Sequence, residues 1–229
     1  MKTKKQTAMK NLVYLFIGLF FFTNAYAQPG RMNKGRQNKM QCMALTMPKE
    51  DMNNKEKQDL LDMALEEKMA YDFYYTMYNK WNIPMFNRRI NAKMHHKNRL
   101  VQMIEKYELT NPVNDQEIGK YKSSRIQKLY NELLNKGQKS LKDALIAAAN
   151  LEEMDIVALK KAIDNTDNAD LRLVYKNLTR GSEHHLKATV NMLFRLYDYK
   201  YEPQYLDKKT FDEIIASSKQ NMQRRNFRN

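Results

Sequence analysis

Apolar side chains recur every three or four residues along most of the chain, which is the spacing of one face of an α-helix. Four long segments show this period: residues 54–81, 84–107, 140–164 and 169–199. Short polar connections separate the first two segments and the last two, whereas residues 108–139 separate the two pairs. Because short loops join antiparallel neighbours, the sequence predicts an all-α four-helix bundle with one long crossover.

Residues at the expected helix ends support these boundaries. Asn53, followed three positions later by Glu56, is typical of a capping box at the start of a helix. Within the crossover, residues 123–137 predict one short helix. A last amphipathic segment, residues 208–218, is expected to pack on the outside. Two helix pairs joined by a single crossover form the ferritin-like topology.

The four histidines occur as two adjacent pairs, His95–His96 and His184–His185. Adjacent residues of a helix point about 100° apart, so one member of each pair can face the interior. The second histidine of each pair shares its face with apolar residues, and the first shares its face with polar or small ones. We therefore expect His96 and His185 to lie inside the bundle, with His95 and His184 in solvent.

Two glutamates interrupt the apolar faces of the other two long helices. Glu67 lies within the inward stripe of the first helix and Glu152 within that of the third. Buried carboxylates are costly unless they are paired or bind a metal. Together with His96 and His185 they place one polar side chain on each helix, which predicts a metal site in the core.

Three stretches of the chain resemble a known family. They read "LEEKMAYDFYYTMYNKWNIPMF", "LEEMDIVALKKAIDNTDNADLRLVYKNLTRGSEHHL" and "YEPQYLDKKTFDEII". They resemble domain-of-unknown-function family 2202, an uncharacterised group within the ferritin-like superfamily. The resemblance covers about residues 54–217 and implies a ferritin-like fold, but no particular activity.

The wider superfamily holds two metal ions between a glutamate on one helix, an E-x-x-H on the next, and a similar set on the other pair. By this resemblance Glu67 is the first-helix ligand and Tyr74 its tyrosine neighbour. His96 and His185 match the two histidines of that pattern, and Glu152 matches the third-helix glutamate. The resemblance thus implies the same four metal ligands as the helical faces do.

Both bridging carboxylates of the superfamily pattern are missing. Lys93 stands three residues before the first inward histidine, and Ser182 three residues before the second. Two divalent ions need about four carboxylates, and Glu66 or Glu153 would add marginal ligands at most. An ammonium about 4 Å from a carboxylate gains about 4 kcal/mol at an effective dielectric near 20, so Lys93 could replace a metal's charge.

Three hypotheses of function follow. The first is a protein that binds iron, manganese or copper in its core, a function that includes redox activity of the bound metal. The second is a non-enzymatic envelope protein without a metal, in which Lys93 supplies the positive charge. The third is a copper-buffering protein that uses methionines of its N-terminal arm, because thioethers and thiolates select Cu(I). Whether the protein is an enzyme, and its oligomeric state, are open at this stage.

The N-terminus is typical of a secretory signal peptide. Residues 1–27 contain four lysines, an apolar run from Leu12 to Phe22, and a small-residue cleavage site after Ala27. The apolar run is too short for a permanent transmembrane helix. We therefore expect an exported protein, periplasmic or secreted, with no transmembrane helix after cleavage. Loss of the peptide and its lysines lowers the net charge from +14 to +10.

The remaining basic charge lies mainly at the two ends of the chain. Residues 28–52 form a Met-rich basic arm that contains Cys42, the single cysteine, and residues 218–229 form a basic tail. Their low apolar content predicts disorder, so the bundle domain is expected to span residues 53–217. The ends could attract anionic envelope surfaces, whereas no nucleic-acid-binding motif is present. One cysteine excludes an intramolecular disulfide.

Overall fold

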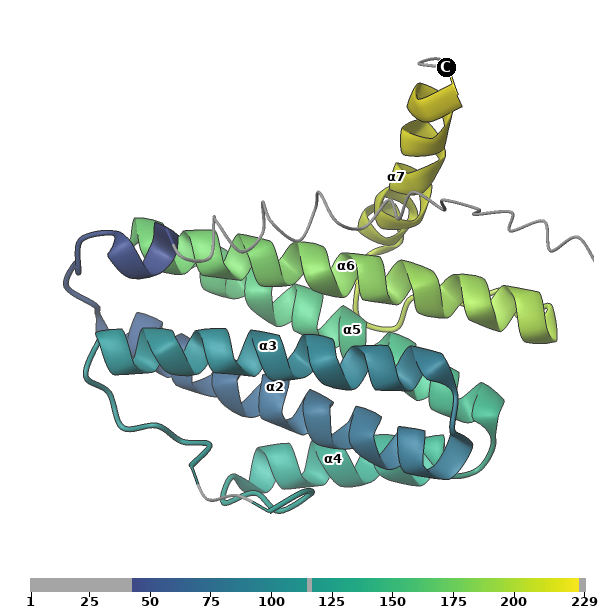
Figure 1. The fold of residues 1–229 in the computed structure, drawn as a ribbon, viewed down its shortest axis with the longest axis horizontal. Coiled ribbons are helices and arrows are strands. Elements are labelled where there is room, and N and C mark those ends of the chain that lie inside the picture. Colours follow the sequence, from purple (N-terminus) through teal and green to yellow (C-terminus); the bar gives the residue numbers. More distant parts are fainter. Residues whose placement is uncertain (1–42, 115–116, 227–229) are drawn as a thin grey trace, which may run out of the picture.

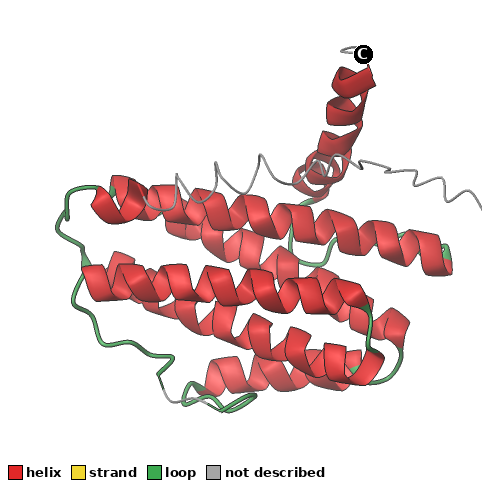
Figure 2. Ribbon diagram, viewed as in Figure 1, coloured by secondary structure: helices red, strands yellow, loops and turns green. Residues whose placement is uncertain are grey.

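The structure is a computed structural model that describes residues 43–114 and 117–226, with side chains as far as residue 217. All regular structure in these ranges is helical (Figure 2). The helices are α2 (Asn54–Trp81), α3 (Pro84–Lys106), α4 (Ser124–Gly137), α5 (Leu141–Asp164), α6 (Ala169–Tyr197) and α7 (Lys208–Asn226). The prediction of an all-α fold is confirmed.

Helices α2, α3, α5 and α6 pack as two hairpins lying against each other (Figure 1). Two residues connect α2 to α3, and residues 165–168 connect α5 to α6. The long crossover from α3 to α5 contains α4, which packs against α2 and α5. Helix α7 contacts α6 and projects away from the bundle (Figure 1). The order and packing of the helices confirm the predicted helical bundle with one crossover and a short helix inside it.

The helix ends follow the local chemistry of the sequence. The side chain of Asn53 accepts hydrogen bonds from the backbone of Lys55 and Glu56, and the Glu56 carboxylate accepts one from the Asn53 backbone, so the predicted capping box is present. Asn82 ends α2 in the left-handed region at φ 47°, a conformation that asparagine tolerates. Pro84 then begins α3, where its missing N–H costs no hydrogen bond.

Helix α2 is buried on two sides, which its hydrophobic period alone does not predict. Asp72, Phe73 and Met77 are fully buried although they lie beside the expected inward stripe. Phe73 and Met77 pack in one cluster with residues of α4. The Asp72 carboxylate accepts hydrogen bonds from the Gly119 backbone at 2.9 Å and from the Tyr121 hydroxyl. The crossover thus covers the second face of α2.

The core consists of two apolar clusters that follow one another along the bundle axis. On α2, α3 and α6, a polar stretch separates residues of one cluster from residues of the other, and on α5 polar residues interrupt the end of one cluster shortly before the other begins. These polar stretches contain Glu67 on α2, Lys93 and His96 on α3, Glu152 and Asp155 on α5, and Ser182 and His185 on α6. The apolar clusters therefore enclose one polar layer from both sides.

The N-terminal arm is only partly within the described residues. Residues 43–46 are helical, Ala44 is fully buried, and the Lys106 ammonium donates hydrogen bonds to the carbonyls of Ala44 and Met47. This part of the arm is therefore packed, unlike the prediction of disorder for residues 28–52. The signal peptide lies outside the described residues, and so do Met32, Met40 and Cys42 of the groups expected to bind copper. Export and copper binding therefore both stay predictions. In the ranges that the structure covers, every helix is too short or too polar to cross a membrane.

Glu153 fastens the segment between α6 and α7 to the bundle. Its buried carboxylate accepts hydrogen bonds from three successive backbone N–H groups, those of Gln204 at 3.0 Å, Tyr205 at 2.8 Å and Leu206 at 2.9 Å. The Tyr201 hydroxyl donates a fourth. This role differs from the prediction that Glu153 neighbours the metal site, because residue 153 points about 100° away from residue 152.

We predict that Glu153→Ala lowers the free energy of unfolding by about 3 kcal/mol. The substitution leaves buried backbone donors without their charged acceptor, and hydrogen bonds to charged groups contribute about 1.5–3 kcal/mol each. Urea denaturation followed by circular dichroism measures the loss. Glu202→Gln, at an exposed glutamate of the same segment, is the control and should change the value by less than about 0.5 kcal/mol. Equal effects of the two substitutions would contradict this role of Glu153.

Candidate functional site

A fully buried lysine lies at the centre of the polar layer. Lys93 on α3 is 0% exposed, and its ammonium donates a hydrogen bond to the Asp155 carboxylate. The same nitrogen is 3.1 Å from Glu152 Oε2 and 3.5 Å from Glu67 Oε2. One cation from α3 thus holds carboxylates from α2 and α5, the helices that face it.

Each of the two glutamates also contacts an imidazole. His96 Nδ1 lies 3.2 Å from Glu67 Oε1, and His185 Nδ1 lies 3.3 Å from Glu152 Oε1. The two rings are nearly parallel, at 16°, with centroids 5.8 Å apart. His185 is buried and His96 mostly so, whereas the first histidine of each pair is exposed. The prediction that the second histidine of each doublet faces inward is confirmed.

Further groups fix these side chains in place. The Tyr74 hydroxyl donates to Glu152 Oε1 at 2.7 Å, and Arg89 Nη2 donates to the carbonyl of His185 at 3.3 Å. A Cβ atom at Gly181 would lie 2.8 Å from His96 Cε1, so a larger residue there would push this ring aside. Ser182 is buried close by in the chain, and within the described residues its hydroxyl has no hydrogen-bond partner.

The protonation states follow from burial and from the charges nearby. Burial raises the pKa values of Glu67 and Glu152, but Lys93 and the adjacent histidines outweigh this effect and hold both pKa values below the ordinary range. Burial raises the pKa of Asp155 well above its ordinary value; Lys93 lowers it only in part, and the two glutamates raise it further. Ionisation is thus favoured at both glutamates and opposed at Asp155.

The imidazole of His185 stays neutral. Burial lowers its pKa to about 4, despite the opposing effect of Glu152. The ring nitrogen that faces the carboxylate is Nδ1, 3.3 Å from Glu152 Oε1. Burial lowers the pKa of Lys93, but its three carboxylates raise it more, so the ammonium stays charged. Two ionised glutamates are thus balanced by Lys93 and by the nearby guanidinium of Arg89.

Sequence reasoning missed two residues of this cluster, Asp155 and Arg89. Asp155 lies three positions after Glu152, and Arg89 four positions before Lys93, so each shares a helical face with a residue that was recognised. This spacing was the one signal in the sequence that Asp155 and Arg89 belong to the cluster. Glu66, predicted as a neighbour of the site, makes no contact with Lys93 and instead pairs with Arg125 of α4 at 2.8 Å.

The side chains present do not fit a pair of metal ions. At the two positions where the superfamily has bridging carboxylates, the chain has a lysine and a serine, Lys93 and Ser182. The Lys93 ammonium lies among the carboxylates that would have to bind a metal. Among the described residues, no three histidine, cysteine, aspartate or glutamate side chains are grouped so that they could hold a metal ion. The arrangement is that of an ion-pair network.

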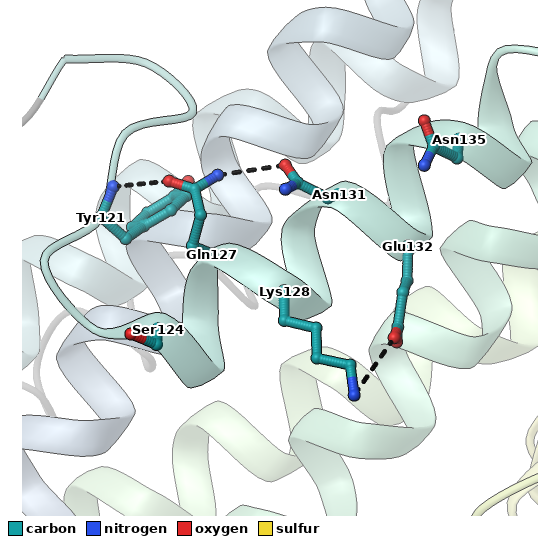
Figure 3. Close-up of a pocket in the computed structure, with 7 residues that line it drawn as sticks. All are labelled: Tyr121, Ser124, Gln127, Lys128, Asn131, Glu132 and Asn135. Carbon is teal, nitrogen blue, oxygen red and sulfur yellow. Dashed lines mark hydrogen bonds and ion pairs between the residues drawn. The ribbon is translucent and has the colours of Figure 1, made fainter.

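A second candidate location is a surface hollow of about 430 Å³ along α4 (Figure 3). Its polar side chains largely bind one another: Gln127 bonds the Tyr121 backbone at 3.0 Å and Asn131 at 3.1 Å, and Lys128 pairs with Glu132 at 4.0 Å. None of the residues of the Lys93 cluster lines this hollow. It offers no group with catalytic geometry.

The fold and this cluster define an all-helical bundle protein with a buried charged layer. The model of the uncharacterised protein domain DUF2202 matches residues 56–218, and the chain belongs to this family. It is similar to uncharacterised protein MJ0754 of Methanocaldococcus jannaschii, with 40% identity over 173 residues that cover 76% of this chain and 93% of the relative. A crystal structure of hypothetical protein MJ0754 from Methanococcus jannaschii shares 39% identity and has a TM-score of 0.73, covering 75% of this chain and 97% of that one.

We predict that Lys93→Met lowers the free energy of unfolding by about 3–5 kcal/mol, because it leaves buried carboxylates without their cation. Adding Glu67→Gln and Glu152→Gln to this variant should restore part of the loss, since uncharged amides need no counter-ion. Urea denaturation measures each step.

The control for this series is Lys97→Met on the same helix, which removes an ammonium 5.9 Å from the centre of the Tyr71 ring. It should cost at most about 1 kcal/mol. A Lys93→Met variant as stable as this control would show that the buried ammonium does not hold the carboxylates.

Proposed function

We propose that this protein is a non-enzymatic, ferritin-like bundle of the cell envelope that works without a metal ion in its core. The observation that carries the proposal is the contact of the Lys93 ammonium with three buried carboxylates. It supplies the positive charge that Glu67 and Glu152 need, at the place where the superfamily pattern has a metal-bridging glutamate. The cluster then joins the helices instead of carrying out chemistry.

Two other parts of this proposal, the ferritin-like fold and export, have support of their own. The ferritin-like assignment is supported by the order of two hairpins and one crossover, and by the four side chains from four helices at a single level of the bundle. Export is supported by the basic, apolar and small-residue parts of residues 1–27. A protein of the envelope with one cysteine has no internal disulfide to hold its helices in place. A charged core that sets the register of the helices would serve this purpose instead.

Lys93→Glu provides the sharpest test of the metal-free proposal. The substitution supplies the missing bridging carboxylate and removes the cation, so the variant should bind Mn²⁺, and Mn²⁺ should raise its melting temperature. The wild-type protein should show neither effect. Isothermal titration calorimetry and thermal scans with and without Mn²⁺ give the two readouts.

Lys93→Gln is the matched control, because it removes the cation without adding a ligand. It should bind Mn²⁺ more weakly than Lys93→Glu. Tight stoichiometric Mn²⁺ or Fe²⁺ binding by the wild-type protein would overturn the proposal, and so would a Lys93→Glu variant that folds but binds no metal.

A second candidate function, binding of one iron, manganese or copper ion in the core, has a specific observation in its favour. The four residues predicted as ligands do converge: each inward imidazole faces a glutamate, and the rings are 5.8 Å apart. A metal ion held by Glu67, His96, Glu152 and His185 would have to displace the Lys93 ammonium. For that reason the metal-free function is the better supported of the two.

A further inference from the structure

A cavity of about 300 Å³ lies between α2, α4 and α5 and borders the Lys93 cluster at Asp155. Its walls are largely apolar and come from all three helices: Met69 on α2, Leu129 on α4, and Leu151 and Met154 on α5. Four charged residues also line it, Glu66, Arg125, Asp155 and Lys161. The volume is at the lower end of the range for small-molecule sites, so a compact apolar group would fill it.

The charges around this cavity are arranged unevenly. Asp155 is a wall residue, but its carboxyl group is already held by the Lys93 ammonium. Arg125 is already held by Glu66, at 2.8 Å. Lys161 also lines the cavity, is exposed, and makes no ion pair with any acidic group in the described part of the chain. Among the described charged residues that line the cavity, Lys161 is thus the one without a counter-ion.

We infer that this cavity binds a small amphipathic anion, a straight apolar chain that ends in one carboxylate. The chain lies against the methionine and leucine side chains, and the carboxylate pairs with Lys161 at the solvent side. A cationic amphiphile should not bind, because its positive charge would be repelled by the Lys161 ammonium. A short carboxylate such as acetate should not bind either, because it has no chain to contact the apolar walls. The inference does not rest on the metal-free function, because none of these contacts needs Lys93 to be charged.

The test is calorimetric titration of the full mature chain with three probes: decanoate, decyltrimethylammonium and acetate. Decanoate should bind at one site, and the other two should not. Lys161→Glu should weaken decanoate binding by about tenfold or more, which corresponds to about 1.4 kcal/mol. Ala158→Trp, which places a large ring in the cavity wall, should abolish binding.

Lys160→Glu is the control, because it makes the same change of net charge at the neighbouring position, which does not line the cavity. It should leave decanoate binding within about twofold of wild type. Circular dichroism establishes that each variant is folded. The inference is overturned if decanoate does not bind, if decyltrimethylammonium binds equally well, or if Lys160→Glu weakens binding as much as Lys161→Glu. A folded Ala158→Trp variant that still binds decanoate would overturn it as well.

Discussion

One buried ammonium, that of Lys93, determines how the polar layer of this bundle is arranged. Three carboxylates surround it, and two of them in turn hold the inward histidines. Without this cation, Glu67 and Glu152 would face each other across the core with no balancing charge. The guanidinium of Arg89 adds a second positive charge near Glu152 and helps to hold its pKa down.

Burying such a layer costs desolvation free energy, but once formed it favours one alignment of the helices over others. Taking charges out of water costs several kcal/mol per ion, and their attraction repays this only with good geometry. Apolar clusters above and below exclude water from the layer, which strengthens each contact within it. If one helix slid by a turn along its neighbours, Lys93 would leave its carboxylates. We infer that the cluster contributes more to the register of the four helices than to the net free energy of unfolding.

The sequence predicted the fold well because its signals are local. The capping box at Asn53, the spacing of apolar residues and the short loops fix the four long helices and their pairing. The same spacing indicated which histidine of each doublet faces inward. The resemblance to family 2202 was carried by contiguous motifs, and the match to that family confirms it.

What the sequence did not predict depends on contacts between distant segments. Asp155 was missed because a lone polar residue beside Glu152 gives no sign that Lys93 comes from another helix to meet it. The burial of Asp72 requires knowing that the crossover returns over α2, and the role of Glu153 requires knowing where residues 204–206 lie. Lys93 was singled out because it stands three residues before His96, but whether the lysine enters the core needed the structure.

Metal content of the protein, purified from the cells that naturally produce it and without chelators, tests the central claim most directly. Inductively coupled plasma mass spectrometry counts iron, manganese and copper per chain, and a His96→Gln/His185→Gln variant prepared in parallel separates core metal from metal bound elsewhere. The account predicts far less than one ion per chain in the core, with no difference between the two proteins. One iron or manganese ion per chain that disappears in the double variant would contradict it.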